Sequence, residues 1–262
     1  EGFYSIAWYE PTLIMHVKKR GDKWGDVEVA PFSGRYPDDD PMLGPEGKKL
    51  YFMSKRPIID GKRKAEKGYN VWFVEKDING KWGTPTYHPG ISRFKGRRGT
   101  FARNGNYYFC RPKGTIGGWD IYRSRYVDGK YSEAENLGGE INSSSNDFSG
   151  QIAPDESFLI YSSIRPELPF GMYISFRKDS GGWTQPRYFG KAINQGRVER
   201  FATLSPNGKY LFFNRQYNRH PEYSENKLSL ADLKRKQQNP QNGFGDIYWV
   251  DARVIERMRD NE

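Results

Sequence analysis

Residues 200–213 read Arg200-Phe201-Ala202-Thr203-Leu204-Ser205-Pro206-Asn207-Gly208-Lys209-Tyr210-Leu211-Phe212-Phe213. An apolar run, a turn of Pro, Asn and Gly, and a second apolar run together predict a β-hairpin. The same arrangement recurs around Gly47, Gly105 and Glu156, so the four turn positions are separated by 58, 51 and 52 residues. Repetition at a fixed spacing of this length is typical of repeat architectures.

A second hairpin pattern follows each of these, as an apolar strand, a Gly-containing turn and an aromatic residue. The turns are Asn79-Gly80, Asp128-Gly129 and Gly181-Gly182, and Gly21-Asp22 adds an N-terminal instance. Asn-Gly and Asp-Gly between apolar runs are strong hairpin signals. Each unit of about 50 residues therefore predicts two hairpins, which form a four-stranded antiparallel sheet.

Such a sheet has two faces to bury, and repeated sheets can bury them against one another. Hydrophobic residues make up only 35% of the chain, whereas aromatic residues reach 16%, which suits thin sheets packed through large rings. A closed ring leaves no long open edge. We therefore expect an all-β, five-bladed β-propeller as a single domain over residues 1–262, with blades at approximately 1–34, 35–89, 90–138, 139–190 and 191–262.

The two ends of the repeat are irregular. The first blade begins at its second strand, Phe3–Trp8, and the last carries a partly helical insertion over Glu225–Lys236. Asp246–Asp251 matches a third strand, and Ala252–Met258 is expected to form either a short helix or a fourth strand.

Composition narrows the classes of function. The net charge is +10 and the sequence pI is about 9.4, which favours an acidic partner. No nucleic-acid-binding motif accompanies this charge, so no nucleic-acid partner is expected. The single cysteine, Cys110, excludes an internal disulfide and a cysteine-based metal site. No apolar stretch reaches 18 residues, so we expect no transmembrane segment. We also expect that the protein has no cofactor and is a monomer.

The hairpin Pro45-Glu46-Gly47-Lys48-Lys49-Leu50-Tyr51-Phe52-Met53-Ser54-Lys55-Arg56-Pro57 resembles the WD40-like repeat of TolB-type β-propellers. Trp119-Asp120-Ile121-Tyr122 and Gly245-Asp246-Ile247-Tyr248 match the later strand of that repeat. The resemblance covers nearly the whole chain and implies a periplasmic or secreted bacterial protein. The repeat is a scaffold found in binding modules, protease-associated propellers and lyases, so it assigns no catalytic residue.

The long irregular segments all lie on the face opposite the hairpin turns, which makes this loop face the candidate site. Reading the hairpins symmetrically about their turns places an arginine at the end of the second strand in four blades. Arg98 is expected opposite Arg111, and Arg200 opposite Arg215, as like-charged pairs. A ring of guanidinium groups would bind a carboxylate- or sulfate-bearing ligand. The expected ligand-binding residues are Arg56, Arg98, Arg111, Arg165, Arg200 and Arg215.

Structural roles remain open for the same arginines. Asp38 or Asp39 could pair with Arg56, and Asp147 with Arg165, while an acid from a neighbouring blade could compensate the like-charged pairs. The two surviving functions are a propeller that binds an anionic carbohydrate or a protein partner, and a carbohydrate-active enzyme.

The enzyme would be a glycoside hydrolase using rim carboxylates, with Asp39, Asp147 and Glu199 as catalytic candidates, or a polysaccharide lyase using Tyr or His. For the lyase the available tyrosines are Tyr69, Tyr217 and Tyr223. His16 is expected on an outer blade surface, His88 and His220 near the loop face. The spacing of the three histidines supports no metal site.

Overall fold

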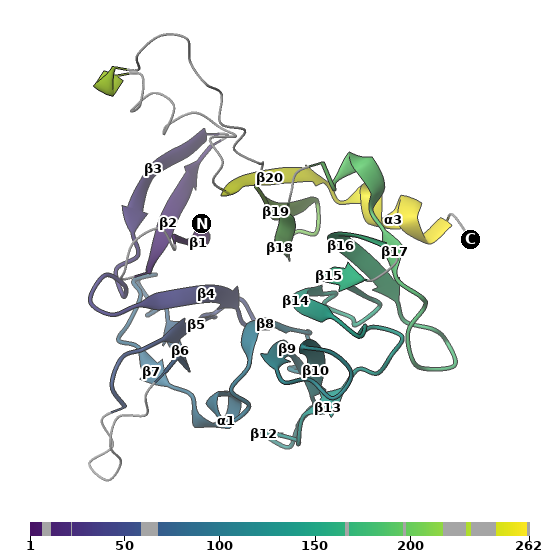
Figure 1. Cartoon of the computed structure of the whole chain (residues 1–262). Coiled ribbons are helices and arrows are strands. Elements are labelled where there is room, and N and C mark those ends of the chain that lie inside the picture. Colours follow the sequence, from purple (N-terminus) through teal and green to yellow (C-terminus); the bar gives the residue numbers. More distant parts are fainter. Residues whose placement is uncertain are drawn as a thin grey trace. The chain divides into compact units, whose positions relative to one another are not determined.

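The computed structural model describes residues 1–6, 12–21, 23–58, 68–165, 168–195, 198–216, 229–231 and 245–260. The chain divides into two compact units. Unit 1 comprises Glu1–Pro112 and Tyr122–Asn136, and unit 2 comprises Lys113–Ile121 and Leu137–Glu262. Both consist mainly of antiparallel sheets (Figure 1).

Unit 1 contains three successive sheets. The first is β1 (Gly2–Ile6), β2 (Leu13–Arg20) and β3 (Lys23–Val29), and the second is β4 (Asp38–Leu43), β5 (Lys49–Ser54), β6 (Asn70–Glu75) and β7 (Thr86–Tyr87). After the short helix α1 (Pro89–Ser92), the third comprises β8 (Arg97–Phe101), β9 (Tyr107–Pro112), the end of β10 (Trp119–Ser124) and β13 (Glu135–Asn136), with the small hairpin β11 (Tyr126–Val127) and β12 (Lys130–Tyr131).

Unit 2 contains two further sheets. The first is β14 (Asn146–Ile152), β15 (Phe158–Arg165), β16 (Leu168–Phe176) and β17 (Arg187–Tyr188), and β14 also joins the start of β10 through one parallel pair, Trp119 with Asn146. The 3-10 helix η1 (Gly190–Ala192) follows. The second is β18 (Val198–Leu204), β19 (Tyr210–Gln216) and β20 (Gly245–Asp251), and the helix α3 (Arg253–Asp260) comes next.

The hairpin turns lie where the sequence predicts them. The N–H groups of Gly47, Gly105, Glu156 and Gly208 each donate to the carbonyl three residues earlier, at 2.8 to 3.0 Å. Glu156 adopts a positive φ of 61°, a conformation that glycine provides without strain at the other three turns.

The described residues give the first and last sheets three strands each, where four per blade were expected. In the last sheet the chain turns into α3 after β20, so the helical alternative for its end is correct and no fourth strand forms there. The helix expected over Glu225–Lys236 falls almost wholly outside the described residues.

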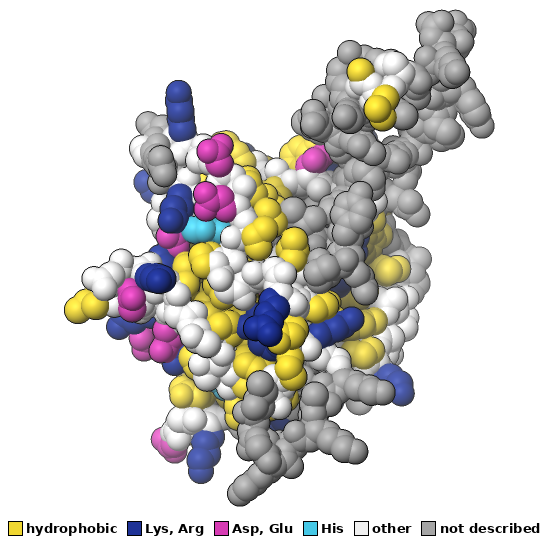
Figure 2. Space-filling view, turned by 90° about the vertical axis from the view of Figure 1, so that its left-hand side faces the viewer, with side chains coloured by type: hydrophobic (Ala, Val, Ile, Leu, Met, Phe, Trp, Pro, Cys, Tyr) yellow, Lys and Arg dark blue, Asp and Glu magenta, His cyan; other side chains and the backbone are white. Residues whose placement is uncertain are grey.

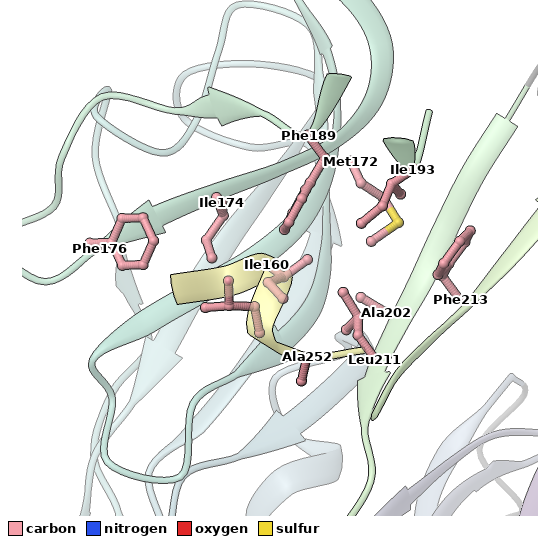
Figure 3. Packing of buried hydrophobic residues seen from close by; sticks show 11 residues of the cluster. Ile160, Met172, Ile174, Phe176, Phe189, Ile193, Ala202, Leu211, Phe213 and Ala252 are labelled. Atoms are coloured by element: carbon pink, nitrogen blue, oxygen red, sulfur yellow. The ribbon is translucent and has the colours of Figure 1, made fainter. Parts of the chain in front are cut away.

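Adjacent sheets pack face to face through large apolar side chains, as the composition predicts. In unit 1, Phe52 and Trp72 of the second sheet meet Ile14 of the first, while Tyr51 meets Phe101 of the third at a ring-centroid distance of 4.7 Å. In unit 2, Ile160 and Ile174 face Leu211 and Phe213 across the interface, and Ala252 closes one end (Figure 3). Burial of these side chains supplies the main stabilisation of the stacked sheets.

The connector before each first strand is fixed to the preceding sheet by one buried polar side chain. Asn194 accepts the N–H of Met172 at 2.8 Å and donates to its carbonyl at 3.1 Å. Asn142 binds both backbone groups of Ile121 in the same way, at 2.8 and 3.0 Å. In unit 1, Ser92 binds those of Val71, and Ser33 accepts the N–H of Ile14. These side chains provide a partner for the strand N–H groups and a second one for carbonyls that also accept a backbone N–H.

The outer strand β3 has an exposed apolar surface, with Trp24 and Val27 each at least half exposed. Figure 2 views the side of the molecule that carries β1 to β3 and shows hydrophobic side chains lying between basic and acidic ones. His16 on the adjacent strand is only 4% exposed, and its ring stacks on Phe3 at 4.7 Å. The expectation that His16 lies on an outer surface is therefore wrong, because β1 covers it.

Candidate functional site

The candidate residues lie where the first strand of each hairpin departs from regular pairing. The register shifts between Asp39 and Met42, between Arg97 and Thr100, between Ser149 and Gln151, and between Arg200 and Thr203. Three of these bulges hold a non-glycine residue at positive φ, namely Asp40 (47°), Arg98 (55°) and Phe201 (60°). Bulges of this kind redirect side chains and are frequent beside functional sites.

The bulges change which residues face each other. Arg97 pairs with Cys110, Glu199 with Arg215, and Arg200 with Asn214. The expected like-charged pairs are thus wrong, by two residues in the third sheet and by one in the last. A symmetric reading of the sequence assumes equal strand lengths on both sides of the turn, and the extra residue in the first strand breaks that equality.

Arg56 is an internal residue. It is 9% exposed, and its Nη2 donates to Asp38 Oδ1 at 2.9 Å and to the carbonyl of Phe32 at 3.1 Å, while its Nε donates to Ser54 at 2.9 Å. Ser33 also donates to Asp38, at 2.8 Å. Of the two acids open for this pair, the structure therefore selects Asp38.

Arg165 in unit 2 repeats this arrangement. Its Nη2 donates to the carbonyl of Ile141 at 2.5 Å and lies 3.8 Å from Asp147 Oδ1. Asp147 is fully buried and accepts hydrogen bonds from Ser143 and Ser163. Burial raises the pKa of Asp147, and the hydrogen bonds and Arg165 oppose that shift. The carboxyl group is enclosed by its own loop, which leaves it poorly placed for attack on a substrate.

Arg215 forms the third internal pair. Its Nε donates to Glu199 Oε1 at 3.1 Å, and its Nη2 donates to the carbonyl of Ile193. Glu199 is 1% exposed and also accepts the N–H of Gln195 at 2.9 Å. In three sheets, therefore, an arginine binds the carbonyl of the preceding connector and a buried acid, a contact that fixes the connector to the blade.

Asp39 and Asp40 belong to a different cluster, which links the second and third sheets of unit 1. Arg97 Nη2 donates to Asp39 Oδ2 at 2.8 Å and its Nε to Asp40 Oδ2 at 3.1 Å. The backbone N–H of Arg98 donates to the same Asp40 oxygen at 3.2 Å. The sequence analysis left open that an acid from a neighbouring blade compensates the like-charged arginines. Asp40 is such an acid, because it lies beside Arg98.

The carboxyl group of Asp40 has a shifted pKa in this cluster. Burial raises the pKa of Asp40, and the adjacent Asp39 raises it further, whereas Arg97 and Arg98 lower it. Two neighbouring carboxyl groups of which one has a raised pKa can in principle divide acid and base roles. Arg97 also stacks on Tyr69, with Cζ 4.4 Å from the ring centroid, and Lys55 lies 5.1 Å from the same ring.

Arg111 and Arg98 are half-buried and lie at this end of the third sheet. Arg111 follows Cys110, whose thiol donates to the carbonyl of Arg97 at 3.5 Å, and its Cζ lies 4.1 Å from the ring centroid of Tyr122. Cys110 itself is buried, as expected. In unit 2 the equivalent position to Arg97 is Arg200, which is half-buried with Cζ 5.3 Å from the ring of Phe201.

Among the described residues, the remaining candidates form no catalytic group. His88 caps α1 through its ring nitrogen, and Tyr217, Tyr223 and His220 lie outside the described residues. Within the part of the chain that the structure describes, no three His, Cys, Asp or Glu side chains are close enough to hold a metal ion. The sequence analysis predicted neither the bulges nor the connector contacts. The Ile-Ser or Ile-Asn pair that recurs at Ser92, Asn142 and Asn194 could have indicated the connector contacts.

Known proteins supply similarities of fold only. No family model matches the chain, and no curated protein matches it. Among solved structures, the chain is similar to TolB from Acinetobacter baumannii, with 16% identity and a TM-score of 0.46 over 83% of this chain and 47% of that one. It is also similar to the periplasmic gluconolactonase PpgL from Pseudomonas aeruginosa, with 12% identity and a TM-score of 0.40 over 82% of this chain and 60% of that one.

A puromycin-hydrolyzing peptidase from Mycobacterium tuberculosis is similar at 13% identity and a TM-score of 0.39, over 82% of this chain and 35% of that one. In each of the three, the chain spans less than two-thirds of the solved protein's length. TolB itself is thus among the similar structures, in keeping with the TolB-type repeat read from the sequence. At these TM-scores the activities named for these proteins do not transfer to this chain. Among the described residues, no helix is long and apolar enough to cross a bilayer.

Proposed function

We propose that this chain is a TolB-type binding propeller that recognises an anionic carbohydrate or a protein partner in the periplasm or outside the cell. The division into five blades is part of this proposal. The site that we assign in unit 1 is the rim formed by Lys55, Arg97, Arg98 and Arg111, to which we refer as the basic rim.

The observation that carries the proposal is the charge balance of this rim. The guanidinium of Arg97 contacts both Asp39 and Asp40, Arg98 lies beside Asp40, Lys55 shares the ring of Tyr69 with Arg97, and Arg111 lies at the same end of the third sheet. Positive charge therefore exceeds negative charge at a half-exposed surface, where guanidinium groups can bind carboxylate or sulfate groups in pairs. Arg56, Arg165 and Arg215 are bound within the fold, so on this view they support the scaffold, and we assign the ligand contacts to the partly or fully exposed residues of the basic rim.

Binding is favoured over catalysis by the state of the acids. Asp147 and Glu199 are buried and hold loop backbone and arginine, so neither is presented to a substrate. These two catalytic candidates are better explained as structural residues.

The test compares matched charge removals in the third sheet. Arg98→Asn suits the positive φ at this position, and Arg111→Gln removes the second cation. Arg103→Gln, in the exposed turn of the same sheet, is the control. We expect each rim variant to weaken binding of uronate oligosaccharides by about tenfold, as the loss of one charge-assisted contact implies, and the control to leave it unchanged. Equal affinity in all variants would contradict the assignment for glycans, and binding of a purified acidic protein would then decide between the two partner classes.

One observation favours a second candidate, a glycoside hydrolase that uses Asp39 and Asp40. An acid and base pair needs two carboxyl groups with different pKa values, and the pKa of Asp40 is raised beside Asp39. Incubation with a panel of uronate-containing and neutral glycans, followed for new reducing ends and unsaturated products, separates this enzyme and a lyase from a binding protein. Products that disappear in Asp40→Asn would establish the hydrolase.

A further inference from the structure

A groove of about 650 Å³ lies in unit 1 between the outer part of the second sheet, α1 and the β11–β12 hairpin. Five ring-bearing side chains line it: Phe73, Tyr87, His88, Tyr126 and Tyr131. Tyr126 adjoins the turn at Gly105, so the groove lies at the opposite end of the third sheet from Arg98 and Arg111. None of the residues of the basic rim lines it.

The walls of the groove are held in place by hydrogen bonds. Asn106 accepts the N–H of Tyr126 at 2.9 Å. Arg93 of the α1 end donates to the carbonyls of Tyr131 and Ser132, each at 2.8 Å, and so fixes the hairpin to the helix. A ligand entering here meets a preformed surface, which reduces the entropic cost of binding.

The rings form a continuous wall. Centroid distances are 6.0 Å from Phe73 to His88, 5.9 Å from His88 to Tyr131 and 4.9 Å from Tyr131 to Tyr126. Tyr126 is 43% exposed and presents the most accessible ring. A polyproline helix repeats every three residues, about 9 Å, and fits slots at that spacing. The rings here follow one another at 5 to 6 Å with interplanar angles of 68°, 67° and 46°, so the groove presents both ring edges and ring faces, on which CH-rich ligand faces can pack.

The charges around the groove are largely paired. Lys49 pairs with Glu75 at 2.8 Å, and Arg93 pairs with Glu133 at 2.7 Å. The hairpin turn adds one exposed acid and one exposed base, Asp128 and Lys130. Of the two charged residues that line the groove, Arg93 is paired with Glu133, which leaves Lys130 beside Asp128 of the same turn, so the surface has a smaller excess of positive charge than the basic rim.

Neutral hydrogen-bonding groups lie between the rings. Burial lowers the pKa of His88, so its imidazole is uncharged near pH 7. Its Nδ1 accepts the N–H of Ile91 at 3.2 Å, which places the ring proton on Nε2 as a donor. Burial also raises the pKa of Tyr131, so its hydroxyl stays protonated. The exposed hydroxyl of Thr86 adds another donor and acceptor.

We propose that this groove binds a neutral saccharide. Its sugar rings pack their CH faces on the wall from Tyr126 to Phe73, and its hydroxyls bond with Thr86, His88 and Tyr131. Aromatic faces with a few uncharged polar groups and little net charge are the chemistry that recognises a polyol with apolar faces. The site is independent of the basic rim in residues, place and ligand charge.

The experiment titrates the whole chain by calorimetry with neutral tetrasaccharides of glucose, mannose, galactose and N-acetylglucosamine. Tyr126→Ala removes the exposed ring, and Val127→Ala, on the same hairpin and 57% exposed, is its matched control. Gly90→Val fills the groove without removing a ring, because a Cβ at Gly90 would lie 3.3 Å from His88 and 3.6 Å from Tyr131. Thermal unfolding of each variant shows whether it is folded.

We expect at least one tetrasaccharide to bind, Tyr126→Ala to lose about tenfold or more in affinity, Gly90→Val to abolish binding, and Val127→Ala to match the parent. Binding should persist in Arg98→Asn with Arg111→Gln, which separates this site from the basic rim. The proposal is overturned if no tetrasaccharide binds, if folded Tyr126→Ala binds like the parent, or if a proline-rich peptide occupies the groove instead. Should Gly90→Val unfold, Tyr126→Ala with its control still decides the question.

Discussion

Replacement of Arg56 by methionine separates a structural arginine from a ligand-binding one. Methionine retains most of the apolar volume, and the guanidinium, which lies 5.0 to 5.6 Å from the rings of Phe52, Trp72 and Tyr36, is removed. Asp38, which is 0% exposed, is then left buried without its cationic partner.

The magnitude follows from what remains around Asp38. Loss of one partner from a buried ion pair costs about 3–5 kcal/mol. Because Ser33 still donates to Asp38 at 2.8 Å, we expect a loss in unfolding free energy near the lower limit, about 3 kcal/mol. With an m-value of about 2 kcal/mol/M, the midpoint of urea unfolding falls by about 1.5 M.

Circular dichroism in urea measures this shift, with Arg103→Met in the exposed turn as a control that should change stability by less than about 0.5 kcal/mol. The double variant Asp38→Asn with Arg56→Met should recover at least about 1 kcal/mol of the loss, because it no longer buries an unpaired charge. A midpoint for Arg56→Met equal to that of the control would refute the structural role and return Arg56 to the ligand-binding set.

Three further outcomes are expected. Asn194→Ala removes the partner of the Met172 N–H, whereas the Met172 carbonyl still accepts the N–H of Phe189 at 3.3 Å, so the variant should cost about 1–3 kcal/mol in urea unfolding; a cost below about 0.5 kcal/mol would show that water replaces the side chain. The raised pKa of Asp40 means that the folded state binds its proton more tightly than the unfolded state does, so its contribution to stability is present at low pH and is lost as pH rises through the folded pKa. Asp40→Asn should therefore be least stable relative to the parent near pH 4 and gain on it toward pH 7, and urea titrations that run parallel across this range would contradict the shift. Gly150→Ala places a Cβ 2.6 Å from the carbonyl oxygen of Ile160 and should lower the melting temperature by several degrees, about 1–3 kcal/mol in stability, and an unchanged melting temperature would mean that the bulge relaxes.

The repeated hairpins could be read from the sequence because they depend on local chemistry. Turn residues at Gly47, Gly105 and Gly208 and the apolar runs beside them specify each hairpin within about 14 residues, and the structure places these turns as predicted. The aromatic content likewise predicted sheets that pack face to face through large rings. Both inferences use interactions between neighbours in the chain or the composition as a whole.

The bulges and the contacts between sheets could not be read in the same way. A one-residue bulge at Asp40 or Arg98 has no distinctive local sequence, yet it shifts every later pair in the strand. Arg97 meets Asp39 and Asp40 across 58 and 57 residues, and only the packing of two sheets brings them together. The groove beside Tyr126 was missed for the same reason, since its walls come from β6, α1 and β12.

The arginines at the strand ends divide by burial, and this division bears on function. Arg56 and Arg215 are 9% and 5% exposed, and each donates hydrogen bonds to a buried acid and to a connector carbonyl. A ligand could reach such a guanidinium only by displacing contacts that hold the connector, and the free energy of that disruption would be subtracted from affinity. Arg98 and Arg111 remain half-exposed at a rim whose acids are already bound by Arg97. On the proposal that the basic rim binds an anionic ligand, the affinity for that ligand should fall with added salt, as expected for partly exposed charges.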